Sequence, residues 1–218
     1  MTLYTPTMIF DGIFTDPDKV REFALSQKYF ISGDNTWPGE RSDYLHEINP
    51  VFFHNVMDRI IKLLYNSDTP IQYNAQASFQ IIDGKYGDGW VHHDGEGSLM
   101  SAIIFLTPGS TSGTSIFKFK NPVTYNTSKY LNDKTESIRN KIPSKSKELH
   151  NSNFEETVSV KGEYNRMVLF DSQLFHAAHQ FFGNTKENSR LTLVVFIKQI
   201  ASKELLPALR LQKAGNGI

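Results

Sequence analysis

The sequence predicts a mainly β domain, a sandwich or a jelly roll, with flanking helices at its N-terminal side. From residue 71 onward, short runs rich in β-branched and aromatic residues are separated by Gly, Asp, Ser and Pro, a pattern typical of successive short strands. Loops separate these runs, rather than the regularly recurring helices of a βαβ fold. Two helical patterns precede them, within about residues 1–70.

The N-terminal part is expected to contain a short strand at residues 8–10 and then two helices. The first helix begins near residues 15–18, where a capping side chain, a proline and acidic residues come together. The second runs over about residues 50–65, with Asn49 as its cap. Its apolar side chains recur at helical spacing, so one face is expected to pack on a sheet; they are Phe53, Val56, Ile60, Leu63 and Leu64.

A polar loop at residues 32–43 separates the two helices and contains Trp37, Pro38, Gly39 and Arg41. Pro and Gly favour a turn at this place. The alternative is that Trp37 and Arg41 shape a substrate pocket.

The strands of the β region are expected to be short, and one long segment interrupts them. Residues 121–155 are rich in Asn, Ser, Thr and Lys, with a short helix expected around 131–140. We interpret this segment as a solvated loop; the alternative is a lid, because long insertions are often functional. Within it, residues 129–147 have six basic side chains against two acidic ones, which leaves an acidic partner open. The expected strands lie at 71–73, 77–82, 100–106, 114–119, 156–160, 167–170 and 191–197, and the basic residues are Lys129, Lys134, Arg139, Lys141, Lys145 and Lys147.

One domain is expected over residues 1–218, because the sequence shows no internal repeat and no second pattern of elements. It divides into helical support over about 1–70, a β core over about 71–200 and a tail at 201–218. In the tail, residues 202–213 show a short helical pattern, with Leu205, Leu206 and Leu209 on one side.

Charge and composition exclude several classes of function. Lys and Arg together number 23, as do Asp and Glu, so no overall field attracts nucleic acid or an anionic membrane. The chain has no cysteine, which excludes disulfides, thiolate metal sites and a cysteine nucleophile. We see neither a signal peptide nor an apolar run of about 20 residues. A soluble, cytoplasmic protein is therefore expected, and the sequence indicates no oligomeric state.

The chemistry is expected at His92, His93 and Asp94. In a His-x-Asp triplet at a strand end, the first and third side chains share a face. The imidazole of His92 and the carboxylate of Asp94 can therefore bind one metal ion, while His93 points away. Such triplets also occur by chance, and an isolated histidine is more often a surface or core residue.

A third metal ligand is expected from His176, which follows the apolar run at residues 167–170. His179 is the alternative, three residues further along. Two histidines and one carboxylate on one side of an octahedral ion leave three positions open, and this arrangement is diagnostic of non-haem Fe(II) oxygenases.

The triplet and the segments that follow it resemble the 2-oxoglutarate/Fe(II)-dependent dioxygenases, most closely their prolyl-hydroxylase-like branch. The resemblance covers about residues 71–198, and its order is more specific than any one piece. The pieces are His92-x-Asp94, the apolar strand at 101–107, the Gly-Thr at 113–114, the Arg-led apolar strand at 166–170, His176, and Arg190-x-Thr192.

The resemblance implies a double-stranded β-helix, that is a jelly roll, with the N-terminal helices packed on one sheet. It implies Fe(II) bound by His92, Asp94 and His176, with O2 and 2-oxoglutarate as cosubstrates and ascorbate as a candidate reductant. Arg190, helped by the Thr192 hydroxyl, would bind the distal carboxylate of 2-oxoglutarate. A guanidinium suits this role because it forks onto a carboxylate through two charge-assisted hydrogen bonds.

The resemblance also implies hydroxylation of an amino-acid side chain, free or in a peptide or protein, with release of succinate and CO2. Halogenating members of the family replace the metal-binding carboxylate with a small residue, whereas Asp94 is present here. Gln80, Tyr86 and Trp90 lie where family members contact substrate or cosubstrate, although packing explains them equally well. Two rival functions remain: a cupin-like binding module without turnover, and a facial-triad oxygenase that does not use 2-oxoglutarate.

Overall fold

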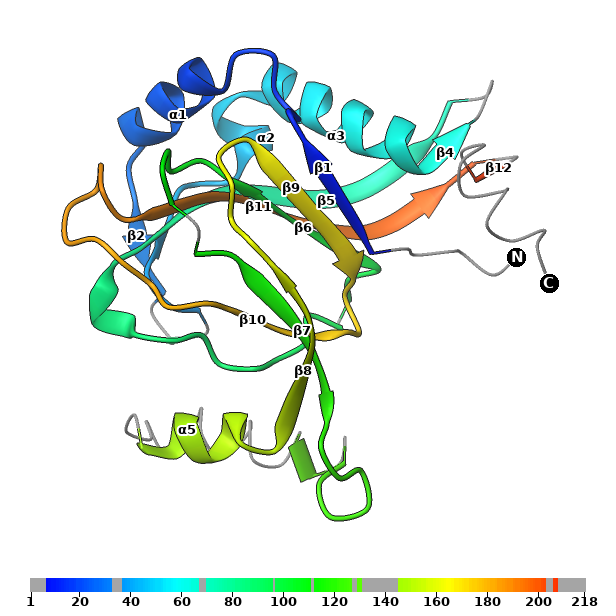
Figure 1. Ribbon diagram of the computed structural model, residues 1–218. Helices are drawn as coiled ribbons and strands as arrows, with labels where there is room; N and C mark the ends of the chain where they lie inside the picture. Colours follow the sequence, from blue (N-terminus) through cyan, green and yellow to red (C-terminus); the bar gives the residue numbers. More distant parts are fainter. Residues whose placement is uncertain are drawn as a thin grey trace.

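The computed structural model describes residues 7–32, 37–66, 70–95, 97–110, 112–126, 129–130, 145–202 and 206–207. Within these ranges a large antiparallel sheet faces a smaller antiparallel sheet, and helices cover the opposite face of the large sheet (Figure 1). The structure confirms the predicted class, a mainly β jelly roll with N-terminal helices packed on one sheet. No helix among the described residues is long and apolar enough to cross a bilayer.

The large sheet has seven strands, and its centre is the pairing of the two longest, β11 and β5. A single strand, β5, replaces the two strands expected at 71–73 and 77–82. The sequence did not predict β3 and β2, which are two residues long and have no period of their own. In spatial order the strands are β1 (Met8–Asp11), β9 (Arg166–Asp171), β6 (Met100–Phe105), β11 (Arg190–Ala201), β5 (Gln72–Ile82), β3 (Glu40–Arg41) and β2 (Phe30–Ile31).

The small sheet has three strands in the order β10 (Phe175–Ala178), β7 (Thr114–Phe119) and β8 (Phe154–Val160). The sequence predicted β7 and β8. It did not predict β10, which has four residues and carries His176. The pairing of β10 with β7 therefore places one candidate ligand on a strand of this sheet.

The two predicted helices form, and both have the expected caps. Asp16 accepts a hydrogen bond from the Lys19 amide, and Asn49 Oδ1 accepts one from the Phe52 amide at 3.0 Å, which satisfies N–H groups that the first helical turn leaves without partners. The short helix α2 was not predicted. The helices are α1 (Pro17–Ser26), α2 (Leu45–Ile48), α3 (Pro50–Leu64) and α5 (Lys145–Asn151), with a 3₁₀ turn η1 (Gly84–Tyr86).

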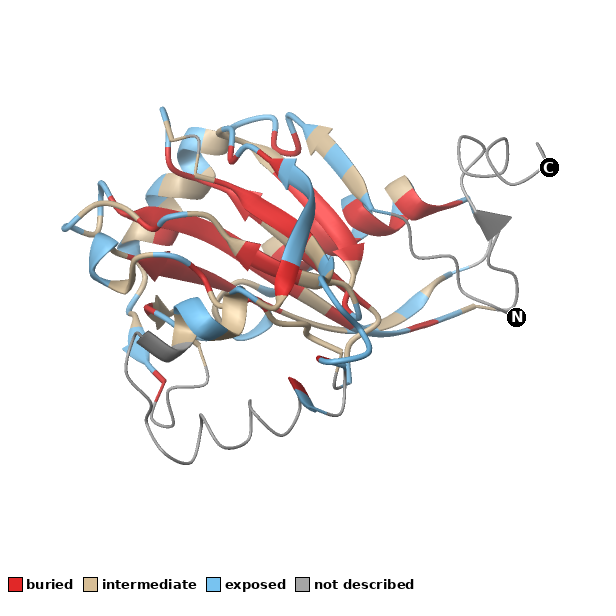
Figure 2. Ribbon diagram, turned by 60° about the horizontal axis from the view of Figure 1, so that its bottom comes forward, coloured by how far each residue is buried: buried red, intermediate tan, exposed pale blue. Residues whose placement is uncertain are grey.

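The two faces of the large sheet have different neighbours, and most of its strands are buried (Figure 2). The outer face packs its apolar residues against α1, α2 and α3. On the inner face, Phe105 and Phe170 cluster with Ile116 and Val160 of the small sheet. Directly opposed residues of antiparallel strands share a face. One such row crosses the inner face: Phe105, Thr192, Gln80 and Arg41.

The helix expected at residues 202–213 is wrong where the structure describes that segment. Strand β12 (Leu206–Pro207) pairs with β4 (Tyr65–Asn66) after the end of α3. The helix expected around 131–140 lies outside the described residues, so the lid over 121–155 stays a prediction.

Gly39 holds the loop at residues 37–39 against the sheet. Its φ is +73°, and a Cβ there would lie 2.2 Å from the Ile81 carbonyl oxygen. Gly12 has nearly the same φ, +72°, with no atom within 4 Å of such a Cβ. Gly12→Ala should therefore cost only the roughly 1–2 kcal/mol of a left-handed side chain. Gly39→Ala should cost about 1–3 kcal/mol more, because the backbone must move. Urea unfolding of both variants measures the difference, and equal losses would contradict the close approach.

Candidate metal centre

His92 and Asp94 lie in the segment between η1 and β6, and the backbone of His176 holds that segment in place. His92 N–H donates to the His176 carbonyl at 2.9 Å, and His176 N–H donates back to the His92 carbonyl at 2.7 Å. The Asp94 amide donates to the Ser172 carbonyl at 2.9 Å. The triplet was expected at the end of a strand, whereas the structure forms a single isolated bridge between His92 and His176.

The bridge brings three candidate ligand atoms together. Asp94 Oδ1 lies 3.5 Å from His92 Nε2, and Asp94 Oδ2 lies 3.4 Å from His176 Nε2. One ligand atom from each residue lies within 4.8 Å of the others. Metal–ligand bonds of about 2.1 Å at right angles separate neighbouring ligand atoms by about 3 Å. A small rearrangement therefore suffices for the three side chains to bind one ion on a single face.

Both histidines present Nε2 as a lone-pair donor. His92 Nδ1 lies 2.8 Å from the Trp90 carbonyl oxygen, and His176 Nδ1 lies 3.0 Å from that of Leu174. A carbonyl oxygen only accepts hydrogen bonds, so each Nδ1 carries the proton. Burial, and then the nearby His92, lower the pKa of His176 to about 4. This imidazole is therefore neutral at neutral pH, as metal binding requires.

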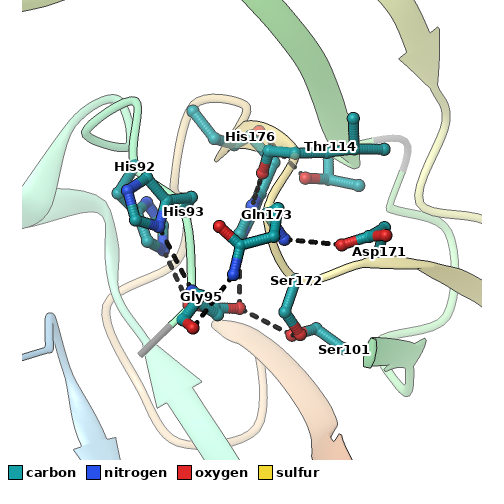
Figure 3. A network of polar contacts seen from close by, with 12 residues as sticks. His92, His93, Gly95, Ser101, Thr114, Asp171, Ser172, Gln173 and His176 are labelled. Atoms are coloured by element: carbon teal, nitrogen blue, oxygen red, sulfur yellow. Dashed lines mark hydrogen bonds and ion pairs between the residues drawn. The ribbon is translucent and has the colours of Figure 1, made fainter. Parts of the chain in front are cut away.

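Asp94 is held by the buried Ser101, which lies beside the buried Ser172 (Figure 3). Ser101 Oγ donates to Asp94 Oδ2 at 2.8 Å and lies 2.9 Å from Ser172 Oγ. Burial alone would raise the pKa of Asp94, but His176, His92, the Ser101 hydrogen bond and Arg41 together lower it below its ordinary value. The carboxylate is therefore ionised and oriented toward the two imidazoles.

Ser101→Ala should weaken metal binding by about 10- to 100-fold, the usual cost of losing a residue that orients a ligand. Titration of the metal-free protein with Co(II), followed by its visible absorption, measures the affinity. Ser78→Ala is the matched control. Ser78 on β5 is also a buried serine of the inner face, and it does not hydrogen-bond Asp94. An equal loss in both variants would show that Ser101 acts only through general packing.

The structure turns His93 and His179 away from the three ligand atoms. The His93 ring packs 5.0 Å from Tyr130 and 5.3 Å from Phe175. His179 Nδ1 accepts from the Gly113 amide, and its Nε2 lies 2.6 Å from Ser115 Oγ. His176, rather than His179, joins His92 and Asp94.

Among the described residues, Arg190 is a buried cation without an anion. It is 4% exposed, and its Nε and Nη2 have no hydrogen-bond partner, nor does the buried hydroxyl of Thr192. Burial lowers the pKa of Arg190 to about 10, so the guanidinium remains charged at neutral pH. No ion pair to Arg190 forms within the described part of the chain, and Glu187, three residues before it, does not pair with it.

The three neighbouring candidates have positioning contacts. Gln80 Nε2 donates to the Pro38 carbonyl at 2.9 Å, which ties the 37–39 loop to the inner face. The Tyr86 carbonyl accepts from Lys147 Nζ at 2.8 Å, so one residue of the basic run anchors α5 beside the triplet. The Trp90 ring lies 5.3 Å from that of His150. The site residue that sequence reasoning missed is Ser101, whose only signal was a hydroxyl in an otherwise apolar strand.

Comparison with known proteins identifies the fold. A family model described as "Family of unknown function (DUF6445)" matches residues 2–197. No curated protein matches the sequence. HygX from Streptomyces hygroscopicus with nickel and 2-oxoglutarate bound is 14% identical and has a TM-score of 0.53, over 89% of this chain and 83% of HygX. EvdO2 from Micromonospora carbonacea var. aurantiaca is 9% identical, also with a TM-score of 0.53, over 94% of this chain and 91% of EvdO2.

The structure of HygX with iron bound has the same TM-score, 0.53, at 14% identity, over 89% of this chain and 82% of HygX. At such identities the likeness shows a common fold. It assigns no activity to this chain, because the residues of the site, and not the fold, determine function.

Proposed function

This chain belongs to the DUF6445 family, a family of unknown function, and from its fold and its site we propose that it is a non-haem Fe(II)- and 2-oxoglutarate-dependent oxygenase. His92, Asp94 and His176 are the proposed iron ligands. The observation that carries the proposal is the combination of this ligand group with the buried, unpaired guanidinium of Arg190.

Arg190 fits the distal carboxylate of 2-oxoglutarate by charge and by its unpaired donors. A buried charge without a partner destabilises a fold, so its presence indicates an anionic ligand. The Thr192 hydroxyl, two residues along β11, lies on the same face and also has no partner. Together they offer N–H and O–H groups to a single carboxylate.

The protein's part in the reaction is binding and orientation. His92, Asp94 and His176 would hold the iron from one side, and positions not taken by the protein would be free for 2-oxoglutarate and O2. When bound, iron and 2-oxoglutarate would supply the oxidation of a C–H bond by O2, with release of succinate and CO2. Two inner-face rings place apolar surface beside the site: the Phe170 ring lies 4.5 Å from that of His176, and the Arg190 guanidinium carbon lies 5.4 Å from the Phe105 ring centroid.

The finer assignment within this class is hydroxylation of an amino-acid side chain, free or in a peptide or protein. The presence of Asp94 supports hydroxylation over halogenation. The resemblance to the prolyl-hydroxylase-like branch supports this class of substrate.

Two rival functions predict different properties of Arg190. A cupin-like binding module would not release succinate, and a facial-triad oxygenase without 2-oxoglutarate would not need a guanidinium at this position. The oxygenase without 2-oxoglutarate does not account for a buried arginine that has no anion among the described residues, and the binding module is distinguished by the absence of succinate.

The test is anaerobic titration of the Fe(II)-loaded protein with 2-oxoglutarate, followed by the visible charge-transfer absorption of the chelate. A saturable band, and succinate formation once O2 is admitted, support the proposal. Tight binding of Fe(II) without any band would contradict the use of 2-oxoglutarate and favour the rivals.

A further inference from the structure

The buried donors that have no hydrogen-bond partner are not scattered over the described residues. Apart from the Tyr65 hydroxyl they form two groups, each built around an arginine. One is Arg190 with Thr192, assigned above to the cosubstrate. The other is Trp37 Nε1 with Arg41 Nε, for which the proposed cosubstrate provides no partner. A buried donor without an acceptor costs about 1–3 kcal/mol, and more if it is charged, so the second group also indicates a ligand.

Aromatic rings surround the Arg41 guanidinium. Its central carbon lies 4.6 Å from the Trp37 ring centroid and 5.5 Å from that of Phe196. These rings stabilise the cation through their faces and restrict its plane. They cannot satisfy its N–H groups as a carboxylate does. Among the described residues, no side-chain oxygen accepts a hydrogen bond from Arg41 and no carboxylate pairs with it.

Arg41 is directed to the same face of the sheet as the candidate metal centre. It stands opposite Gln80, which stands opposite Thr192. Phe196 stands opposite Ser101, the residue that binds Asp94. Burial lowers the pKa of Arg41 to about 10, and the Asp94 charge opposes this shift. Arg41 is therefore near enough to Asp94 to sense its charge without forming an ion pair with it.

The loop that carries Trp37 is built to stay in place. Gln80 holds the Pro38 carbonyl from the inner face. Gly39 approaches the Ile81 backbone too closely for any side chain. Because both contacts are made with β5, Trp37 and Arg41 form a pre-organised pair beside the metal site.

The balance of charge indicates which anion would bind. In the proposed complex, Fe(II) and Arg190 cancel the charges of Asp94 and the 2-oxoglutarate dianion. Arg41 then remains as a single uncompensated positive charge. A carboxylate group brings one negative charge to Arg41 and matches the guanidinium fork, and an ammonium group on the same substrate would have to stay hydrated for this balance to hold. A phosphate dianion would instead leave an excess negative charge beside the site.

We infer that Arg41, with Trp37, binds a carboxylate of the substrate and that the substrate is therefore a small carboxylic acid such as a free amino acid. This inference rests on the proposed function for the reaction and for the charge balance, whereas the unpaired donors of Arg41 and Trp37 do not depend on it. It favours the free amino acid over an internal residue with an uncharged side chain, because the α-carboxyl group of an internal residue is in a peptide bond. It makes Arg41 a specificity-determining residue on the same face of the sheet as the candidate metal centre.

The test uses the fluorescence of Trp37. The chain has two tryptophans, so Trp90→Phe leaves Trp37 as the only one. This metal-free variant is titrated with each non-aromatic L-amino acid and, separately, with the carboxamide of each. At least one acid should give a saturable response, and its carboxamide should bind about tenfold more weakly or worse, because the amide has no charge to offer the guanidinium.

The same titration in Arg41→Met and Arg190→Met, each with Trp90→Phe, separates the two arginines. Arg41→Met should lower the affinity for the acid by about tenfold or more. Arg190→Met should leave this affinity unchanged. Arg41→Lys keeps the positive charge but not the forked pair of donors, so its affinity for the acid should lie between those of the proteins with arginine and with methionine at position 41. This intermediate affinity guards against a folding defect in the methionine variant. An unchanged response in Arg41→Met, equal binding of acid and amide, or no saturable response to any acid would overturn the inference.

A further measurement tells the two proposals apart. In one outcome, Arg41→Met weakens the binding of 2-oxoglutarate in the charge-transfer titration as strongly as Arg190→Met does. In that case Arg41 belongs to the cosubstrate site, and the inference fails while the proposed function stands. If the charge-transfer band is absent but the fluorescence response depends on Arg41, the carboxylate site stands and the proposed function fails.

Discussion

Arg190→Met should abolish tight binding of 2-oxoglutarate and, at the same time, stabilise the ligand-free protein. Arg190 is 4% exposed and two of its nitrogens have no partner. Removal of a buried, hydrogen-bonded charge pair costs about 2–5 kcal/mol, so the dissociation constant should rise by on the order of a hundredfold. Without the ligand, methionine fills a similar volume and removes an uncompensated charge, which should stabilise the fold by roughly 1–3 kcal/mol.

A general folding defect would lower both the affinity for 2-oxoglutarate and the stability, whereas this prediction has the affinity fall and the stability rise. The affinity is measured by the charge-transfer titration, and the stability by urea unfolding of the metal-free protein. Arg21→Met is the matched control, because the Arg21 guanidinium donates to the Leu106 and Glu187 carbonyls at 2.8 and 2.6 Å. It should lose stability and keep its affinity. If Arg190→Met also lost stability, Arg190 would have a structural partner and its role as an anion site would be in doubt.

His176→Ala should remove metal binding, whereas His179→Ala should preserve it. His176 Nε2 lies 3.4 Å from Asp94 Oδ2 and carries no proton. The loss of this ligand should lower the metal affinity by more than the roughly 10- to 100-fold expected for the loss of a residue that only orients a ligand. His179 has neighbours on the small sheet instead, the Gly113 amide and the Ser115 hydroxyl. His179→Ala should therefore cost about 1–3 kcal/mol of stability, because the buried Gly113 amide loses its acceptor.

Anaerobic equilibrium dialysis with Fe(II) measures the first effect in both variants, and urea unfolding measures the second. Retention of wild-type affinity by His176→Ala would remove His176 from the ligand set. A parallel loss of metal by His179→Ala, without any loss of folding, would identify His179 as the ligand.

The parts of the fold that could be predicted are those with their own periodic pattern. The apolar alternation of 114–119 matches β7 residue for residue, and the caps at Asp16 and Asn49 mark the starts of α1 and α3. Strands β2, β3 and β12 are two residues long, too short for any period, and form because a neighbouring strand is already there. The strand β5 was divided in two because its first half is less buried and tolerates polar residues.

The candidate ligands could be predicted because their signal is local, a His-x-Asp triplet and a histidine after an apolar strand. That they bind iron stays a prediction. The contacts that complete the site join residues far apart in the sequence, such as Ser101 with Ser172 and Arg41 with Phe196. These depend on the register of β3, β5, β6 and β11, which no single segment of sequence determines.

The support of the two histidines is unlike that of the carboxylate, and this has a consequence for evolution. Each imidazole is oriented by the carbonyl two residues before it in its own chain segment, Trp90 for His92 and Leu174 for His176. A backbone carbonyl remains after any substitution at those positions, so mutations there do not easily change the orientation of either imidazole. Asp94 instead relies on the side chain of Ser101. Inherited variation that keeps the three ligands should therefore change the metal affinity mainly through position 101. The residues that contact the substrate can diverge independently.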